Sequence, residues 1–171
     1  NPIEHSLSPR LHNHWFKTND ISAFYDKKKL NEEEIEKFIN DIRKQKIVGA
    51  NVTVPFKKIV IPYLDKLTKE AEATQSVNTI YFENNNLIGH NTDISGFENA
   101  IRNLNFNISN KKIFILGAGG VTPSIIFALD KMRVSDIIIS NRTKEKAENL
   151  QKNFNHLKIV KWGVVPEFDV I

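Results

Sequence analysis

The chain has 171 residues, 40% of them hydrophobic and 26% charged, a balance typical of a globular protein with a packed core. It has no cysteine, which excludes disulfide bonds, zinc–thiolate sites and cysteine nucleophiles and is compatible with a reducing cytoplasm. The net charge of +4 is interleaved with acidic residues, so it favours an anionic, phosphate-bearing ligand over nucleic acid. No apolar run approaches the roughly 20 residues that a membrane helix needs.

The first half of the chain alternates short helical and extended patterns. Hydrophobic spacing predicts, in order, a helix over 8–19, a strand over 22–28, an amphipathic helix over 31–45, a strand over 47–56, a broken helical segment over 58–67 and a hairpin over 78–93. Ser8 is the expected N-cap of the first helix, with Pro9 as its first residue. Asn31 precedes a run of glutamates, which suits the positive end of the second helix.

The second half has longer apolar runs. They predict a helix over 97–105, a polar loop over 107–112, a buried strand over 113–116, a glycine turn that opens a helix, and a buried strand over 136–140. Strand, helix and strand in this order form a βαβ unit with parallel strands. We therefore predict an α/β protein of two domains, 1–95 with a mixed sheet and 96–171 with a Rossmann-like fold.

The glycine turn "GAGG" at 117–120 is typical of a dinucleotide-binding loop. Gly117 permits a tight turn, and Gly119 lets the backbone approach a pyrophosphate at the positive end of the helix that follows. The third position of the usual fingerprint, normally Gly or Ala, is Thr122 here.

The residues after strand 136–140 bear on the choice of dinucleotide. A site selective for NAD tends to carry Asp or Glu here to bind the ribose 2′-hydroxyl, whereas Asn141, Arg142 and Thr143 suit a 2′-phosphate. They favour NADP over NAD. The alternative is an ordinary strand-to-helix turn in which Thr143 caps the next helix.

Other polar residues allow both a functional and a structural interpretation. Ser6 and Ser8 would share a face of an extended segment and could hold a carboxylate, but their spacing alone favours simple capping by Ser8. Lys57 follows the strand of "NVTVPFKK", and Asp93 ends "GHNTD" with Asn91 on the same face of a strand. A lysine beside a carboxylate can act as an acid–base pair, although Asp93 alone is more commonly a helix N-cap.

The chain has five histidines, and His12 and His14 lie two apart on a predicted helix, where they point to different faces. No carboxylate cluster accompanies them, so we expect no metal site. The motifs of serine hydrolases and of P-loop phosphoryl transfer are also missing from the sequence.

Several motifs together resemble the shikimate dehydrogenase family, in that family's order and close to its spacing: "NPIEHSLSPRLHN", "GANVTVPFKK", "SVNTI", "GHNTDISGF", "GAGG" and "NRTKEKA". The resemblance implies an N-terminal α/β substrate domain with a mixed sheet over 1–95 and a truncated Rossmann-like NADP-binding domain over 96–171. It implies NADPH-dependent reduction of 3-dehydroshikimate to shikimate, in the aromatic amino-acid pathway of the cytoplasm. The expected partners are this small molecule and no nucleic acid or membrane, with a homodimer as one possible assembly.

The resemblance also implies roles for individual residues. Lys57 would be the acid–base residue, paired with Asp93. The expected substrate-binding residues are Ser6, Ser8, Thr53, Lys57, Asn78 and Asp93. The expected cofactor-binding residues are Gly117, Ala118, Gly119, Gly120 and Val121 at the pyrophosphate, and Asn141, Arg142 and Thr143 at the 2′-phosphate. Asn51 would support the site, and Lys58 would be a solvated lysine.

Both ends of the chain lead us to expect a fragment, because it begins at Asn1 without a methionine and stops at Ile171 inside the apolar run "FDVI". Against the family pattern, the first strand and the C-terminal part would be missing. Two alternatives remain: a quinate/shikimate dehydrogenase, which typically favours NAD, and a truncated, non-catalytic nucleotide-binding module. Lys57 and Asp93 argue against the module, since binding alone does not need that pair.

Overall fold

The computed structural model describes residues 3–171, so Asn1 and Pro2, which open the first family motif, lie outside the described residues. The elements of the first half are α1 (Ser8–Thr18), η1 (Glu32–Glu34), α2 (Ile35–Arg43), β1 (Gly49–Asn51), η2 (Ile61–Tyr63), β2 (Lys66–Leu67), α3 (Lys69–Thr74), β3 (Thr79–Glu83) and β4 (Asn86–His90). Those of the second half are α4 (Asp93–Asn103), β5 (Lys112–Leu116), α5 (Thr122–Lys131), β6 (Asp136–Ser140), α6 (Lys144–Asn153) and β7 (Lys158–Ile159).

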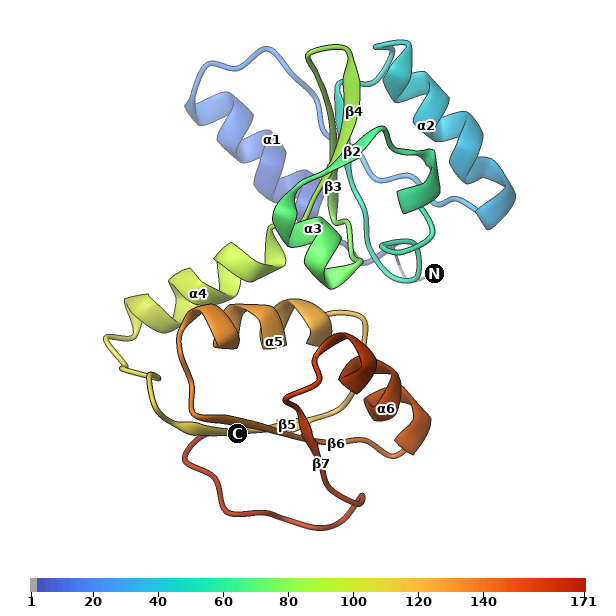
Figure 1. Ribbon diagram of the computed structural model, residues 1–171. Coiled ribbons are helices and arrows are strands. Elements are labelled where there is room, and N and C mark those ends of the chain that lie inside the picture. Colours follow the sequence, from blue (N-terminus) through green and yellow to red (C-terminus); the bar gives the residue numbers. More distant parts are fainter. Residues whose placement is uncertain (1–2) are drawn as a thin grey trace.

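These elements form two lobes, each with its own sheet (Figure 1). The first sheet has the order β1-β3-β4-β2 and is mixed, because β2 runs parallel to β4 while the other pairs are antiparallel. The second has the order β5-β6-β7 and is parallel. A separate set of buried apolar residues packs in each lobe. The predicted α/β class, with a mixed sheet followed by a parallel one, is confirmed.

The predicted hairpin is confirmed in β3 and β4. Its turn lies at Asn84 and Asn85, whose φ angles of 47° and 61° are the left-handed values that a tight hairpin turn requires. Asparagine tolerates this region better than most residues, which explains the Asn-rich sequence. Ile80 and Leu87 from the two strands are buried in the first core.

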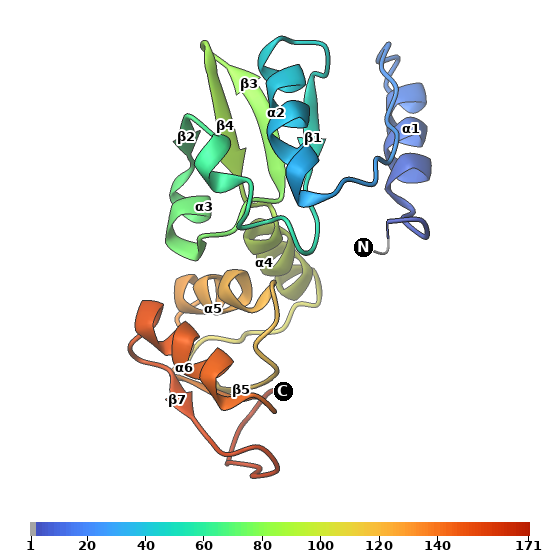
Figure 2. The same cartoon turned by 90° about the vertical axis from the view of Figure 1, so that its right-hand side faces the viewer.

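Helix α2 covers one face of the first sheet (Figure 2). Ile35, Ile39 and Ile42 are buried on the stripe that helical spacing predicts. The helix is preceded by the turn η1, where the backbone N–H of Asn31 donates to Oε2 of Glu34 at 2.8 Å. The polar residues before the helix thus satisfy its first donor groups, as the sequence indicates.

The predicted strand over 22–28 is wrong, because this extended segment has no strand beside it. Its backbone is instead satisfied by a side chain of α1: Tyr25 N–H donates to Oδ1 of Asn13, and Nδ2 of Asn13 donates to the Tyr25 carbonyl, each at 2.8 Å. Figure 2 shows α1 and this segment standing apart from the sheet, beyond β1.

The strand predicted over 47–56 is much shorter than expected. Only β1 pairs with β3, and the chain then turns at a cis Val54–Pro55 peptide, where Phe56 N–H donates to the Thr53 carbonyl. Proline has no N–H to donate to a sheet, so the pairing cannot continue through it. Val54 therefore lies beyond the end of β1 and is 58% exposed.

Several element boundaries also differ from the sequence predictions. The N-cap of α1 is Leu7, and Ser8 is the first helical residue. Asp93 and Asn91 do not lie on a strand, because β4 ends at His90 and Asp93 opens α4, four residues before the predicted helix start. The segment expected to be a broken helix contains η2 and the short strand β2, and sequence patterns did not indicate α3 or β7.

Helix α4 carries the chain from the first lobe to the second and packs along α5, which also contacts α3 (Figure 1). Glu98 of α4 is 8% exposed and pairs with Lys131 of α5, with 2.7 Å between Oε1 and Nζ. The domain division expected after residue 95 falls inside α4 and stays a prediction. Across residues 3–171, no helix is long and apolar enough to span a membrane.

Gly49 and Gly96 differ in the space around them, so their substitution by alanine should change the stability of the protein in opposite directions. A methyl group on Gly49 would lie 2.7 Å from the carbonyl oxygen of Ile80, so Gly49→Ala must push β1 away from β3. We expect it to lower the free energy of unfolding by about 1–3 kcal/mol. A methyl group on Gly96 of α4 would have no atom within 4 Å, so Gly96→Ala should raise the free energy of unfolding by roughly 0.5 kcal/mol. Urea unfolding of both variants tests this, and equal stabilities would contradict it.

Candidate active site

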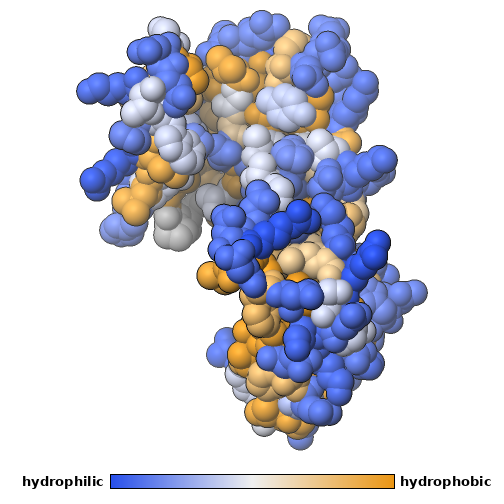
Figure 3. Space-filling model, turned by 90° about the vertical axis from the view of Figure 1, so that its left-hand side faces the viewer, coloured by the Kyte–Doolittle hydropathy of each residue, from blue (hydrophilic) through white to orange (hydrophobic). Residues whose placement is uncertain are grey.

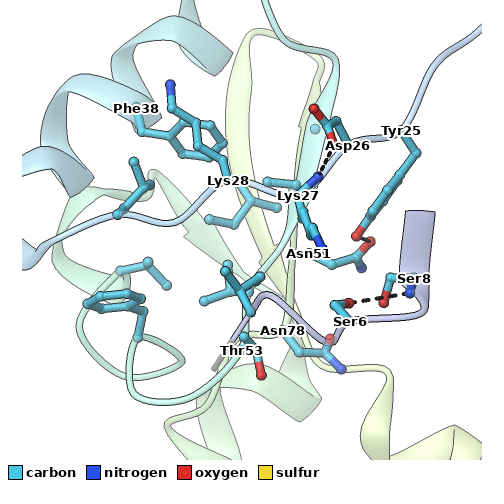
Figure 4. Close-up of a pocket in the computed structure, with 18 of the residues that line it drawn as sticks. Ser6, Ser8, Tyr25, Asp26, Lys27, Lys28, Phe38, Asn51, Thr53 and Asn78 are labelled. Atoms are coloured by element: carbon cyan, nitrogen blue, oxygen red, sulfur yellow. Dashed lines mark hydrogen bonds between the residues drawn. The ribbon is translucent and has the colours of Figure 1, made fainter. Parts of the chain in front are cut away.

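A groove of about 870 Å³ lies in the first lobe. One side is formed by α1 and the segment that follows it, and the other side by the end of β1. The space-filling surface is hollowed on this face (Figure 3). All the residues predicted to bind substrate line the groove: Ser6, Ser8, Thr53, Lys57, Asn78 and Asp93. They come from distant parts of the chain, and Figure 4 shows Ser6, Ser8, Thr53 and Asn78 around a common space.

The groove is lined by an ion pair between Lys57 and Asp93. Nζ of Lys57 lies 2.5 Å from Oδ2 of Asp93, and the two side chains are only 17% and 23% exposed. The turn after Pro55 carries Lys57, whose carbonyl accepts the N–H of Val77 at 2.8 Å. Asp93 is the first residue of α4, where the helix dipole favours a negative charge. Partial removal from water strengthens the attraction between the two groups.

Asn78 fixes the other oxygen of the Asp93 carboxylate. Its Nδ2 donates to Oδ1 of Asp93 at 2.9 Å, and its Oδ1 accepts from the Thr92 N–H and the Thr79 hydroxyl, each at 3.0 Å. The same amide thus binds both a backbone N–H group and the Asp93 carboxylate. Both oxygens of Asp93 are therefore held in place.

The hydrogen-bond network continues to the far side of the groove. Nδ2 of Asn51 donates to the Thr79 hydroxyl at 3.2 Å, and the Tyr25 hydroxyl donates to Oδ1 of Asn51 at 3.0 Å. Tyr25 also stacks on His12, with 4.3 Å between ring centroids. Burial raises the pKa of the Tyr25 phenol, more than its hydrogen bond with Ser8 lowers it, so the group stays a neutral donor at neutral pH.

Tyr25 belongs to the segment that was wrongly predicted as a strand, and no sequence signal connects it to Asn51 or Ser8. The two serines also differ from expectation. Oγ of Ser6 accepts the N–H of Ser8 at 3.3 Å, so Ser6 rather than Ser8 supplies the side-chain bond at the start of α1. Thr53 is exposed in the groove, beside the turn that carries Lys57.

The glycine loop lies at the start of α5. Gly117 has φ 113°, a value that favours glycine. Gly119 N–H donates to Oγ1 of Thr122 at 2.9 Å, and the same hydroxyl donates to the Gly117 carbonyl at 3.3 Å. Thr122, the departure from the usual fingerprint, thus braces the loop. Within residues 3–171, the N–H groups of Gly120 and Val121 have no hydrogen-bond partner, which suits an anion at this helix end.

The predicted 2′-phosphate residues follow β6, next to this loop. Oδ1 of Asn141 accepts the N–H of Ala118 at 3.0 Å, and its Nδ2 donates to the Thr143 carbonyl at 2.7 Å. Arg142 is exposed beside them, and Lys146, which the sequence interpretation did not single out, is a second exposed cation in the first turn of α6. The loop approaches the first lobe: a methyl group on Gly120 would lie 3.8 Å from Cγ2 of Val54. The glycine loop thus lies close to the turn that carries Lys57, where the two lobes meet.

The described part of the chain, 3–171, has no group of three or more His, Asp or Glu side chains that could hold a metal ion. The site offers a half-buried ammonium–carboxylate pair near a dinucleotide-type loop.

Comparison with known proteins identifies the family. The model of the shikimate dehydrogenase substrate binding domain matches residues 1–80, and that of shikimate / quinate 5-dehydrogenase matches residues 98–167. The chain is 54% identical, over all of its 171 residues, to the shikimate dehydrogenase (NADP(+)) of Pelagibacter ubique. The chain belongs to the shikimate dehydrogenase family.

Solved structures of shikimate dehydrogenases agree with this assignment. The enzyme of Aquifex aeolicus superposes with a TM-score of 0.87 at 39% identity, over 93% of this chain and 59% of that one. That of Thermus thermophilus, solved in complex with NADP(H) and shikimate, gives 0.84 at 29% identity, over 94% of this chain and 60% of that one. The chain spans 64% of the length of the Pelagibacter enzyme.

We expect Asn141 to stabilise the conformation of the glycine loop. In Asn141→Ala, the N–H of Ala118 loses its acceptor and the loop loses its tie to β6, so we expect the free energy of unfolding to fall by about 1 kcal/mol. We also expect weaker binding of NADP+ to the full-length protein, measured by calorimetry. Asn149→Ala, on an exposed face of α6, is the control. Equal NADP+ affinities in the two variants would argue against this role.

Proposed function

We propose that the protein reduces 3-dehydroshikimate to shikimate with NADPH. The observation that carries this proposal is the Lys57–Asp93 pair, which lies in one groove with the other predicted substrate residues. The glycine loop approaches Val54, in the turn that also carries Lys57. The proposal is supported by the relatives, since the Pelagibacter enzyme is named for NADP(+) and the Thermus structure holds NADP(H) and shikimate.

The residues of the glycine loop and those that follow β6 suit a dinucleotide bound next to the groove. The unpaired N–H groups of Gly120 and Val121 would bind the pyrophosphate, and Arg142 would pair with the 2′-phosphate, with Thr143 beside it. When bound, NADPH supplies a hydride to the ketone carbon. Val54 lies where the two lobes approach each other and would help to exclude water there.

Lys57 performs the proton transfer in this proposal. Hydride addition to a ketone leaves negative charge on its oxygen, and the Lys57 ammonium donates the proton that makes the hydroxyl group. Asp93 holds the ammonium in place, and Asn78 in turn holds Asp93. In the reverse direction the neutral lysine amine accepts the same proton from shikimate.

The remaining groove residues would recognise the substrate. Ser6 and Ser8 lie at the start of α1 and offer hydroxyl groups to the substrate carboxylate. Thr53, Asn78 and Asp93 would bind the ring oxygens. Asn51 is a positioning residue in this scheme, because its amide connects Thr79 to the Tyr25 hydroxyl.

Quinate is the second candidate substrate, because the family model of the second lobe is described for both shikimate and quinate. Rates of shikimate and quinate oxidation with NADP+ and with NAD+ decide between the two. The alternative of a non-catalytic nucleotide-binding module would be supported by dinucleotide binding without turnover. A homodimer and a cytoplasmic location also remain predictions.

Replacement of Lys57 tests the proposed chemistry. In the full-length protein, we expect Lys57→Ala to lower kcat at least about a hundredfold with little change in NADP+ affinity, because only proton transfer is lost. The control is the neighbouring, exposed Lys58→Ala, which should keep wild-type turnover. Near-wild-type turnover in Lys57→Ala would refute the assignment.

Arg142 tests the choice of cofactor. Arg142→Ala should weaken NADP+ binding roughly tenfold or more and leave NAD+ binding nearly unchanged, because only NADP+ carries the 2′-phosphate. Lys152→Ala, in the last turn of α6, is the charge-matched control. Equal losses for the two dinucleotides would rule out the 2′-phosphate role.

A further inference from the structure

A buried amide lies at the junction of the two lobes. Asn91, in the link between β4 and α4, is 1% exposed, and its neighbour Ser124 in the first turn of α5 is fully buried. An amide removed from water to this degree is costly unless its polar atoms find partners.

Every polar atom of this side chain has a partner. Nδ2 of Asn91 donates to Oγ of Ser124 at 2.8 Å and to Oγ1 of Thr74 at 3.1 Å, and its Oδ1 accepts the backbone N–H of Asp93 at 3.0 Å. Thr74 is the last residue of α3, Ser124 belongs to α5, and Asp93 opens α4. One side chain therefore connects three helices across the boundary between the lobes.

One end of this connection leads to the ion pair in the groove, and the other end leads to the glycine loop. Asp93 carries the carboxylate that pairs with Lys57. The N–H of Ser124 donates to the carbonyl of Val121 at 3.0 Å, and Thr122 braces the glycine loop. The bonds made by Asn91 thus form a continuous covalent and hydrogen-bonded connection between the partner of the proton donor and the glycine loop.

We propose that Asn91 is a positioning residue for hydride transfer: it holds the Lys57–Asp93 pair at a fixed distance from the glycine loop. This role rests on the function proposed above. Asn91 does not line the groove, so it acts through Asp93 and Ser124 and does not touch the reactants. Its effect should be large on turnover, because a displacement of about 1 Å between reacting atoms can cost up to a hundredfold in rate.

Ser124→Ala in the full-length protein tests the proposal, because it removes the bond between the lobes and keeps the bond from Asn91 to Asp93. We expect kcat for shikimate oxidation to fall about tenfold or more, while KM for shikimate and NADP+ each change less than about twofold. A purely structural role would lower the amount of folded protein and leave the kcat of the folded fraction unchanged.

Thr74→Val is the matched control. It removes the other acceptor of the same Nδ2 group but lies within the first lobe, so its kcat should stay within about twofold of wild type. Ser124→Cys, which keeps a weak sulfur acceptor, should recover part of the lost turnover, and it replaces Ser124→Ala in the comparison if that variant does not fold.

Three results would count against these assignments. Wild-type kcat in Ser124→Ala, or an equal fall in Thr74→Val, would overturn the role of Asn91 while an active wild type leaves the proposed function standing. A full-length wild type that binds NADP+ but does not oxidise shikimate would overturn the proposed function itself.

Discussion

The ion pair between Lys57 and Asp93 is the interaction on which the arrangement of side chains in the groove depends. Its two members are 36 residues apart and come from a turn and from the start of a helix, so no local structure holds them together. A partly buried charge is stable only when its partner and its remaining hydrogen bonds are in place. Nδ2 of Asn78 meets this requirement by donating to the Asp93 carboxylate, and Oδ1 of Asn91 accepts the backbone N–H of the same residue.

This requirement explains why polar side chains line the groove beside the ion pair. Asparagine and threonine side chains form a continuous set of hydrogen bonds from Tyr25 to Asp93, and Asn91 extends it to α5. Hydrogen bonds are directional, so a connected set of them fixes positions that apolar contacts would leave adjustable. The network that stabilises the charged pair therefore also fixes the positions of the side chains that line the groove.

Strand pairing was the least predictable part of the fold. Residues 22–28 have the composition of a strand, but Asn13 satisfies the Tyr25 backbone in place of a neighbouring strand. Residues 47–56 have the alternation of a strand, but Pro55 ends the pairing early. The short strands β2 and β7 have no clear pattern and exist because longer strands lie beside them. In each case the deciding hydrogen-bond partner is distant in the sequence.

The sequence by itself determined the α/β class, the hairpin with its Asn84–Asn85 turn, the amphipathic helix over α2 and the βαβ unit with its glycine turn, because periodicity and turn chemistry are local properties. It also identified residues that the structure brings into one groove. The family motifs indicated that Lys57 pairs with Asp93, and the structure brings the two side chains into contact. Only the tertiary structure decided that Tyr25 joins the groove and that Asn91 connects both lobes. These contacts join residues 26 to 36 positions apart in the chain, which residue spacing cannot specify.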